Sequence, residues 1–102
     1  AIQFMLADMK TKIEASRMLT WKSAADGDAG VSNTESAAHA KRFASDTAME
    51  VTTDAVQVYG GYGYSEEYPV ARLMRGAKVM QIYEGSSQVQ RMIIGREITK
   101  DL

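Results

Sequence analysis

The sequence predicts an all-α fold, an up-and-down helical bundle of two long and two shorter helices. Apolar residues recur at spacings of three and four, the pattern of one face of a helix. Glycine and the single proline gather at a few places between these periodic segments, where they favour turns. A length of 102 residues fits one domain, so residues 1–102 are treated as a single unit.

The first long helix is expected from Ala1 to about Ala25, because this stretch has neither glycine nor proline. Ile2, Met5, Met9 and Ile13 share one face at helical spacing. The run Asp26–Gly30 has the composition of a loop and is expected to end the helix.

The second long helix is expected from about Ser32 to Tyr59. Ser32 and Glu35 have the spacing of a capping box, in which two side chains satisfy the free backbone donors of a first turn. Small residues, mostly alanine, recur along the helix and allow a neighbouring helix to approach closely. Gly60 and Gly61 predict its end, since glycine accepts a left-handed cap.

The rest of the chain predicts two shorter helices. A loop of glycine and aromatic residues is expected at 60–65, and Pro69 fits the first turn of a helix that ends near Lys78. Residues 79–84 favour an extended segment by propensity. Ser86 and Ser87 both suit a helix cap, Ser87 with Gln90 at capping-box spacing, before a last helix over about 88–100.

Composition excludes several classes of function. The 12 basic and 13 acidic residues give a charge near zero, which does not favour a nucleic-acid partner. Without cysteine there is neither a disulfide framework nor a thiolate metal site, and the lone His39 is a poor ligand, so no metal is expected. No apolar run has the roughly 20 residues of a membrane span. The expected core is thin for a domain that stands alone, because 14 of the apolar residues are alanine. We therefore expect this chain to be a piece of a longer protein.

Two stretches are candidates for chemistry. Gly60–Gly63, with its neighbouring tyrosines, is a helix-ending turn or a place where backbone approaches a flat or phosphorylated ligand. Glu84 is either a first-turn acid that stabilises a helix start or a base within an apolar wall formed with Ile82 and Tyr83. Such a wall would raise the pKa of the carboxyl toward values useful for proton abstraction. Ser86, Ser87 and the free N–H groups beside them suit an anion.

Three strings carry a resemblance to a known family: AIQFMLADM at 1–9, AMEVTTDAVQVYGGYGYSEEYPVARLMRGAK at 48–78 and QIYEGSSQVQRMIIGREI at 81–98. Their content, order and separation resemble the C-terminal helical domain of the acyl-CoA dehydrogenases, in particular the medium- and short-chain branch. The family's N-terminal helical domain and middle β domain have no counterpart in these 102 residues. Where the family usually reads RDAK, this chain has Gly76 in place of the aspartate, which puts local stability in doubt.

The resemblance implies a homodimeric or homotetrameric flavoprotein of fatty acid β-oxidation that contains FAD. Such enzymes oxidise an acyl-CoA to the trans-2-enoyl product and pass electrons to an electron-transferring flavoprotein. The base matches Glu84 in the string IYEG, and its own N–H, with a ribityl hydroxyl of the flavin, faces the thioester oxygen. The flavin carries out the hydride chemistry, and the protein supplies position and electrostatics.

The resemblance also implies binding positions. Ser86 and Gln88 match contacts to the FAD of the same subunit, whereas Gln57, Gly60 and Gly61 match contacts to the FAD of a neighbouring subunit. Tyr83 and Gly85 match positions at the acyl-CoA substrate.

Two other readings stay open. An acyl-CoA oxidase-like relative would pass its electrons to oxygen, and a non-catalytic, self-associating helical module would fit the thin core. A pocket with one wall does not exclude water, so the 102-residue chain alone is expected to be inactive. The expected compartment is the cytoplasm for a bacterial protein and the mitochondrial matrix for a eukaryotic one.

Overall fold

The computed structural model describes all residues from 1 to 102, and it confirms the all-α class. Five helices follow one another along the chain: α1 (Ile2–Asp28), α2 (Thr34–Tyr59), α3 (Gly61–Tyr64), α4 (Pro69–Met80) and α5 (Ser87–Thr99). The two long and two shorter helices are those that the sequence predicts, and α3 adds a single turn within the expected glycine and aromatic loop.

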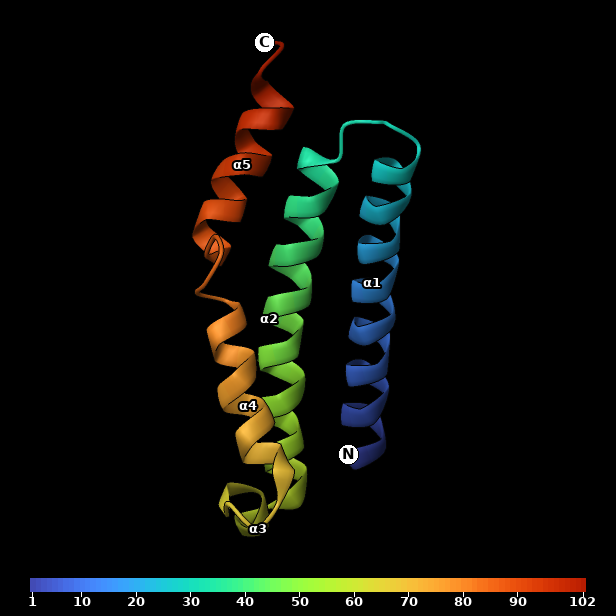
Figure 1. Cartoon of the computed structure of the whole chain (residues 1–102). Coiled ribbons are helices and arrows are strands. Elements are labelled where there is room, and N and C mark those ends of the chain that lie inside the picture. Colours follow the sequence, from blue (N-terminus) through green and yellow to red (C-terminus); the bar gives the residue numbers. More distant parts are fainter.

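Helix α2 is the centre of the molecule (Figure 1). Helix α1 runs antiparallel along one flank of α2, and α4 and α5 follow one another in the same direction along the other flank. Helix α1 packs only against α2, and α4 and α5 also pack on α2. The result is an elongated body with extents of 51 × 25 × 25 Å rather than a bundle closed around a central core.

Small side chains let α2 take this central place. Its buried residues are Ser36, Ala38, Ala40, Ser45 and Thr47, none of which carries a large side chain. The Ser45 hydroxyl donates to the Lys41 carbonyl at 2.6 Å, so a buried polar group is satisfied within the helix. No buried side-chain nitrogen or oxygen lacks a partner.

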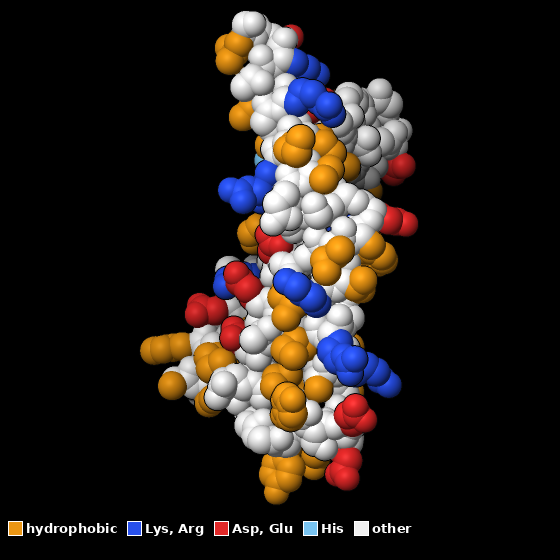
Figure 2. All heavy atoms as spheres, turned by 90° about the vertical axis from the view of Figure 1, so that its left-hand side faces the viewer, with side chains coloured by type: hydrophobic (Ala, Val, Ile, Leu, Met, Phe, Trp, Pro, Cys, Tyr) orange, Lys and Arg blue, Asp and Glu red, His pale blue; other side chains and the backbone are white.

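The apolar core is as thin as the composition predicts. Its buried apolar members are Ala38, Ala40, Val70 and Ala77, and no large side chain is fully buried. Phe4 is 78% exposed and Trp21 59% exposed. On the flank of α4 and α5, hydrophobic groups emerge along the whole length of the surface, between charged ones (Figure 2). Much apolar surface thus remains open to a partner.

Two expectations about the α1–α2 connection are wrong. Helix α1 continues through Asp26 and Gly27 to Asp28, and the Asp26 carbonyl then accepts the Val31 N–H at 2.9 Å. One glycine in a helix costs only about 1 kcal/mol, which the packing of a long helix overrides. The capping box also does not form, because Asn33 is the N-cap of α2 and no side chain caps it.

Two further expectations fail near α5. Val79 and Met80 complete α4, so the predicted extended segment is absent, and helix packing on α2 outweighs local propensity. The capping box of Ser87 and Gln90 does not form either. Ser86, which was also expected to suit a cap, is confirmed as the N-cap, and its hydroxyl oxygen accepts the Val89 N–H at 3.3 Å. The predicted start of α4 at Pro69 and end of α2 at Gly60 are confirmed.

Candidate functional site

The turn that joins α4 to α5, here called the 81–86 turn, carries most of the predicted site. Tyr83, Glu84, Gly85 and Ser86 lie in it, and Gln88 lies in the first turn of α5. The Tyr83 N–H donates back to the Val79 carbonyl at 3.0 Å, which ends α4. The Ser87 N–H donates to the Gln81 carbonyl at 3.1 Å and closes the turn on itself.

Glu84 has an unusual backbone. Its φ of 52° makes it the one residue other than glycine with a positive φ in the chain. A side chain costs about 1–2 kcal/mol in the left-handed region. Gly85 follows at φ 92°, so the chain reverses direction over two residues in rare conformations. Strain of this kind persists only where neighbours hold it, and it is typical of functional sites.

The strained turn leaves backbone donors free. The N–H groups of Glu84, Gly85 and Ser86 donate no hydrogen bond within the chain. They precede the start of α5, where the helix dipole also favours negative charge. The turn therefore offers N–H donors directly beside the Glu84 carboxylate.

Lys41 holds the turn from α2, a role that sequence reasoning missed. Its ammonium donates to the carbonyls of Met80 at 2.5 Å, Tyr83 at 3.3 Å and Gly85 at 3.4 Å. The same nitrogen lies 5.7 Å from the centre of the Tyr83 ring, within the range of a cation–π contact. No sequence pattern signals this, because the partners lie about forty positions downstream.

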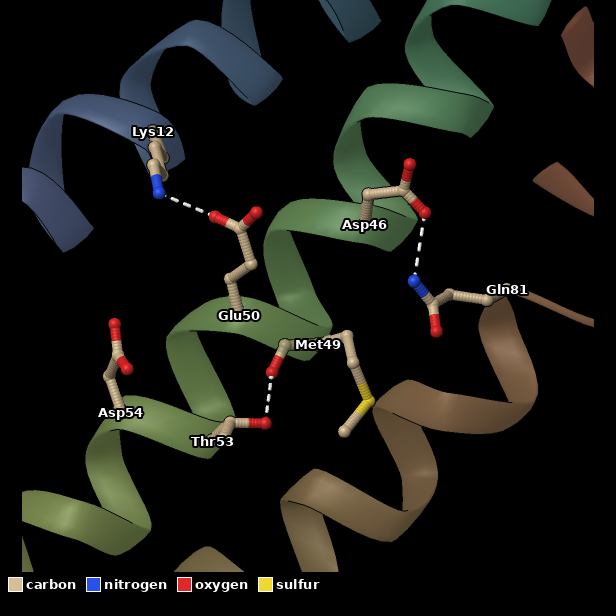
Figure 3. A pocket seen from close by; sticks show the side chains of 7 residues that line it. All are labelled: Lys12, Asp46, Met49, Glu50, Thr53, Asp54 and Gln81. Atoms are coloured by element: carbon tan, nitrogen blue, oxygen red, sulfur yellow. Dashed lines mark hydrogen bonds and ion pairs between the residues drawn. The ribbon is translucent and has the colours of Figure 1, made fainter.

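Asp46 provides a second anchor from α2, which sequence reasoning also missed. One of its carboxylate oxygens accepts from the Gln81 amide at 2.8 Å, drawn in Figure 3, and from the Ser87 hydroxyl at 2.9 Å. Lys41 and Asp46 are both half-buried and lie five positions apart on α2. Together they tie both ends of the 81–86 turn to the central helix.

Gln90 supports the turn from α5. It is 8% exposed, and its side-chain amide donates to the Gly85 carbonyl at 3.2 Å. A Cβ on Gly85 would lie 2.5 Å from that amide nitrogen. Position 85 therefore favours glycine mainly because of its positive φ, and a side chain there would also displace the Gln90 amide from the Gly85 carbonyl.

The apolar wall predicted around Glu84 does not form within this chain. Glu84 is exposed, and Ile82 and Tyr83 are 60% and 49% exposed. A shallow cavity of about 390 Å³ lies beside the turn, and Lys41, Ala44, Met80 and Glu84 are among its lining residues. The carboxylate stands at an open rim because no helix of the chain covers it.

The other predicted contacts lie at the far end of α2. Gln57 is in its last turn, and its carbonyl accepts the Gly60 N–H at 3.0 Å. The twelve residues of α4, about 18 Å of helix, separate Gly60 and Gly61 from the 81–86 turn (Figure 1). Tyr59, Tyr62 and Tyr68 form edge-to-face pairs there, with ring centres 5.9 and 5.7 Å apart. The chain thus has two separate candidate regions.

A third, polar region lies between α1 and α2 and includes the end of α4. Lys12 of α1 reaches across to Glu50 of α2 at 2.5 Å, beside Asp46 and Asp54 (Figure 3). This hydrogen bond and ion pair with Glu50 raise the pKa of Lys12 above its ordinary value of 10.5. The cavity is about 580 Å³, and Met49 is its single hydrophobic lining residue.

No three acidic or histidine side chains are placed to hold a metal ion, and no helix is both long and apolar enough to cross a membrane. His39 lies 3.9 Å from Glu35 on the same helix, with its side chain 41% exposed.

Comparison with known protein families identifies the family of this chain. The family model described as "Acyl-CoA dehydrogenase, C-terminal domain" matches residues 1–99. The chain belongs to the acyl-CoA dehydrogenase family. This confirms the resemblance that the three strings indicate.

Curated relatives are dehydrogenases of acyl-CoA thioesters. Cyclohexane-1-carbonyl-CoA dehydrogenase of Geobacter metallireducens is 55% identical over 100 residues, which are 98% of this chain and 26% of that protein. The short-chain-specific acyl-CoA dehydrogenase of Megasphaera elsdenii is 61% identical over 95 residues, 93% of this chain and 25% of that protein. The chain therefore spans about a quarter of the length of the relatives it matches.

Solved structures share the arrangement of the helices. Butyryl-CoA dehydrogenase of M. elsdenii superposes with a TM-score of 0.93 at 60% identity, over 95% of this chain and 25% of that one. A chain from work on the electron transferring flavoprotein of Acidaminococcus fermentans gives a TM-score of 0.97 at 56% identity, over 99% and 27%. An FAD complex of PigA superposes with a TM-score of 0.92 at 25% identity, over 95% of this chain and 25% of that one.

Proposed function

We propose that this chain is the C-terminal helical domain of an FAD-dependent acyl-CoA dehydrogenase and that it carries the catalytic base, Glu84. The 81–86 turn is the observation that carries the proposal. In this turn, Glu84 has a strained backbone and presents both its carboxylate and its unpartnered N–H group. The chain that carries this turn is a member of the acyl-CoA dehydrogenase family. The proposed product is the trans-2-enoyl-CoA.

The reaction needs a base and an oxyanion donor. A Glu84 oxygen takes the α-proton, and the electrons of that C–H bond form the enolate of the thioester. The N–H of Glu84 faces the thioester oxygen, where the negative charge develops. FAD, when bound, supplies the acceptor for the hydride that leaves the β-carbon, so the substrate loses one proton and one hydride.

The residues proposed to hold FAD fit such a group. Ser86 caps α5 through a hydrogen bond that its oxygen accepts, which leaves its hydroxyl hydrogen free to donate. Gln88 is exposed in the first turn of α5. At the other end, a Cβ at Gly60 or Gly61 would meet nothing within 4 Å, so this backbone is open to a large ligand. We assign Ser86 and Gln88 to the FAD of the same subunit, and Gln57, Gly60 and Gly61 to that of a neighbour.

Tyr83 and Gly85 are assigned to the acyl-CoA substrate. Both flank Glu84, and Tyr83 lines the cavity beside the turn together with Glu84. We further propose that the parent enzyme is a homodimer or homotetramer and that an electron-transferring flavoprotein reoxidises it. The proposal of this partner is supported by the similar chain whose structure is described with the electron transferring flavoprotein of A. fermentans. The compartment predicted above, bacterial cytoplasm or mitochondrial matrix, stays a prediction.

We propose that the 102-residue chain alone is inactive and self-associates. Exposed Phe4, Met18 and Trp21 on α1 favour association, because burying them against a partner removes apolar area from water. Light scattering at micromolar concentration is expected to show oligomers. A well-folded monomer would contradict this second proposal and leave the first intact.

The test of Glu84 is anaerobic bleaching of the flavin in the full-length parent protein. The Glu84→Gln variant keeps the shape of the side chain, and we expect its rate of bleaching by acyl-CoA to fall by about 10²–10⁴-fold. Glu67→Gln, an exposed glutamate before α4, is the matched control and should bleach as the parent does. Bleaching of Glu84→Gln at the parent rate would refute the assignment. Peroxide formation during turnover would favour the oxidase-like alternative.

A further inference from the structure

Lys41 has an unusual set of partners for a lysine. Its ammonium forms no ion pair with any carboxylate of the chain. It donates to three carbonyls instead, those of Met80, Tyr83 and Gly85. An ammonium has three N–H donors and no acceptor, so these carbonyls use its full capacity.

Helix capping alone does not explain this arrangement. The Met80 carbonyl belongs to the last turn of α4, and a lysine there satisfies an orphan acceptor in the ordinary way. The other two carbonyls lie outside the helix, on the residues immediately before and after Glu84. Lys41 therefore holds the backbone on both sides of the residue with φ 52°.

The contact with Tyr83 has a geometric consequence for Glu84. The Tyr83 carbonyl and the Glu84 N–H belong to one planar trans peptide unit, in which they point in opposite directions. A hydrogen bond that fixes the carbonyl toward Lys41 therefore aims the Glu84 N–H away from Lys41. That N–H has no partner in the chain and is free for a ligand.

The contact also has an electrostatic consequence. A cation that bonds to the carbonyl of a peptide polarises the whole unit and makes its N–H a stronger donor. Lys41 thus acts on the direction and on the strength of the N–H that we assign to the thioester oxygen.

We propose that Lys41 is a positioning residue of the reaction, which orients and polarises the oxyanion donor through the Tyr83–Glu84 peptide. This inference rests on the proposed function of Glu84. Because its ammonium donates to three backbone carbonyls, we assign Lys41 no part in proton transfer. Its effect is on the enolate-like transition state, so its loss lowers kcat more than it changes KM.

The test uses the flavin-loaded, full-length parent protein and the variants Lys41→Met and Lys41→Arg. Lys41→Met keeps the length of the side chain and removes the charge. Lys41→Arg keeps the charge, but a planar guanidinium does not converge on three carbonyls as an ammonium does. Lys22→Met is the matched control, because Lys22 is exposed and pairs only with Asp26 within α1.

The first readout is the division between kcat and KM. We expect Lys41→Met to lower kcat by roughly 10–100-fold, as the misplacement of a reacting group does, with KM within about threefold of the parent value. Lys41→Arg is expected to lower kcat several-fold, and Lys22→Met to match the parent.

The second readout does not depend on turnover. The infrared carbonyl stretch of bound trans-2-enoyl-CoA, labelled with ¹³C at the thioester carbonyl, reports the strength of the hydrogen bond to its oxygen. The parent should shift this stretch to lower frequency than in water, and Lys41→Met should lose much of that shift. A structural role alone would lower stability or flavin content and leave the frequency of the folded fraction unchanged.

The outcomes separate the inference from the proposed function. If either Lys41 variant binds flavin and retains both the parent kcat and the parent carbonyl frequency, the role of Lys41 is wrong, whatever Glu84→Gln shows. If Lys41→Met fails to fold, Lys41→Arg decides by the same two readouts. If Glu84→Gln is fully active, the proposed function is wrong, and the role of Lys41, which rests on it, is wrong with it.

Discussion

The two flanks of α2 are held in different ways. On the α1 flank, the ion pairs are exposed: Lys12 pairs with Glu50 across the helices, and the other ion pairs lie within α1. On the flank of α4 and α5, half-buried Lys41 and Asp46 bond to the backbone and side chains of a turn. Exposed ion pairs contribute little, whereas the part-buried hydrogen bonds of Lys41 to Gly85, and of Asp46 to Gln81 and Ser87, fix geometry. The part-buried contacts of Lys41 and Asp46 thus gather at the turn that contains the strained residue, Glu84.

The largest expected effect is at the turn itself. Gly85→Ala places a side chain at φ 92° and against the buried amide of Gln90. We expect a loss of about 2–3 kcal/mol in the free energy of unfolding. Urea unfolding of the 102-residue chain at a fixed protein concentration measures it.

Gly61→Ala is the matched control, because a Cβ at Gly61 meets nothing within 4 Å and its φ is not positive. It should change stability by less than about 1 kcal/mol. If Gly85→Ala and Gly61→Ala lowered the free energy of unfolding equally, Gly85 would be no more constrained than an ordinary glycine.

The next effect is at the second anchor. Asp46→Ala leaves the Gln81 amide and the Ser87 hydroxyl without their acceptor, and we expect a loss of about 1.5–3 kcal/mol. Asp54→Ala is the control. It removes a carboxylate that lines the same cavity but forms no hydrogen bond, and its effect on the free energy of unfolding should stay within about 0.5 kcal/mol. If both variants unfold at the same urea concentration, Asp46 is not an anchor.

A stabilising change sharpens the contrast between helix and turn. Gly76 lies on an exposed position of α4, where a Cβ meets nothing within 4 Å. Gly76→Ala should stabilise the chain by about 0.5–1 kcal/mol, because alanine loses less backbone entropy in a helix. A loss of stability would show that the glycine has a packing role that its open surroundings do not reveal.

The smallest effects are expected on the α1 flank, and their sign depends on pH. The hydrogen bond with Lys10 lowers the pKa of Glu14 below its ordinary value of 4.5. The stability that this gives is present above pH 4.5 and is lost as pH falls through the lower pKa of the folded state. The raised pKa of Lys12 gives stability below pH 10.5 that is lost above the folded pKa.

Thermal unfolding of the chain between pH 6 and pH 3 measures the Glu14 contribution. Glu14→Gln should flatten the decline of Tm over this range slightly, and added salt should reduce the difference. A large change in Tm at neutral pH would contradict the view that this flank relies on exposed, weak pairs.

Local signals predicted much of the fold. The spacing of Ile2, Met5 and Met9 predicted α1, and Gly60 and Pro69 correctly marked an end and a start. The capping predictions were less successful, because the pairs Ser32–Glu35 and Ser87–Gln90 have the right spacing in the wrong register. Asn33 occupies the N-cap position of α2 without a side-chain hydrogen bond, and Ser86, which was also predicted to suit a cap, is the N-cap of α5.

The candidate site was predictable only in part. The resemblance placed Glu84 and its neighbours, and the structure brings Tyr83, Glu84, Gly85, Ser86 and Gln88 together. The positive φ of Glu84 and the contacts of Lys41 and Asp46 carry no local signature, since they arise when α4 packs back on α2. The prediction of an apolar wall was wrong for this chain, because the presence of Ile82 and Tyr83 beside Glu84 in the sequence does not say whether a second surface covers them.

The most direct measurement is exchange of the substrate's α-protons with deuterated solvent in the full-length parent protein. An acyl-CoA analogue with sulfur at the β position cannot lose a hydride, so mass spectrometry of its deuterium content reports proton abstraction alone. We expect exchange in the parent protein and a decrease of about 10²–10⁴-fold in flavin-loaded Glu84→Gln. Exchange at the parent rate in that variant would contradict the assignment of Glu84 as the base.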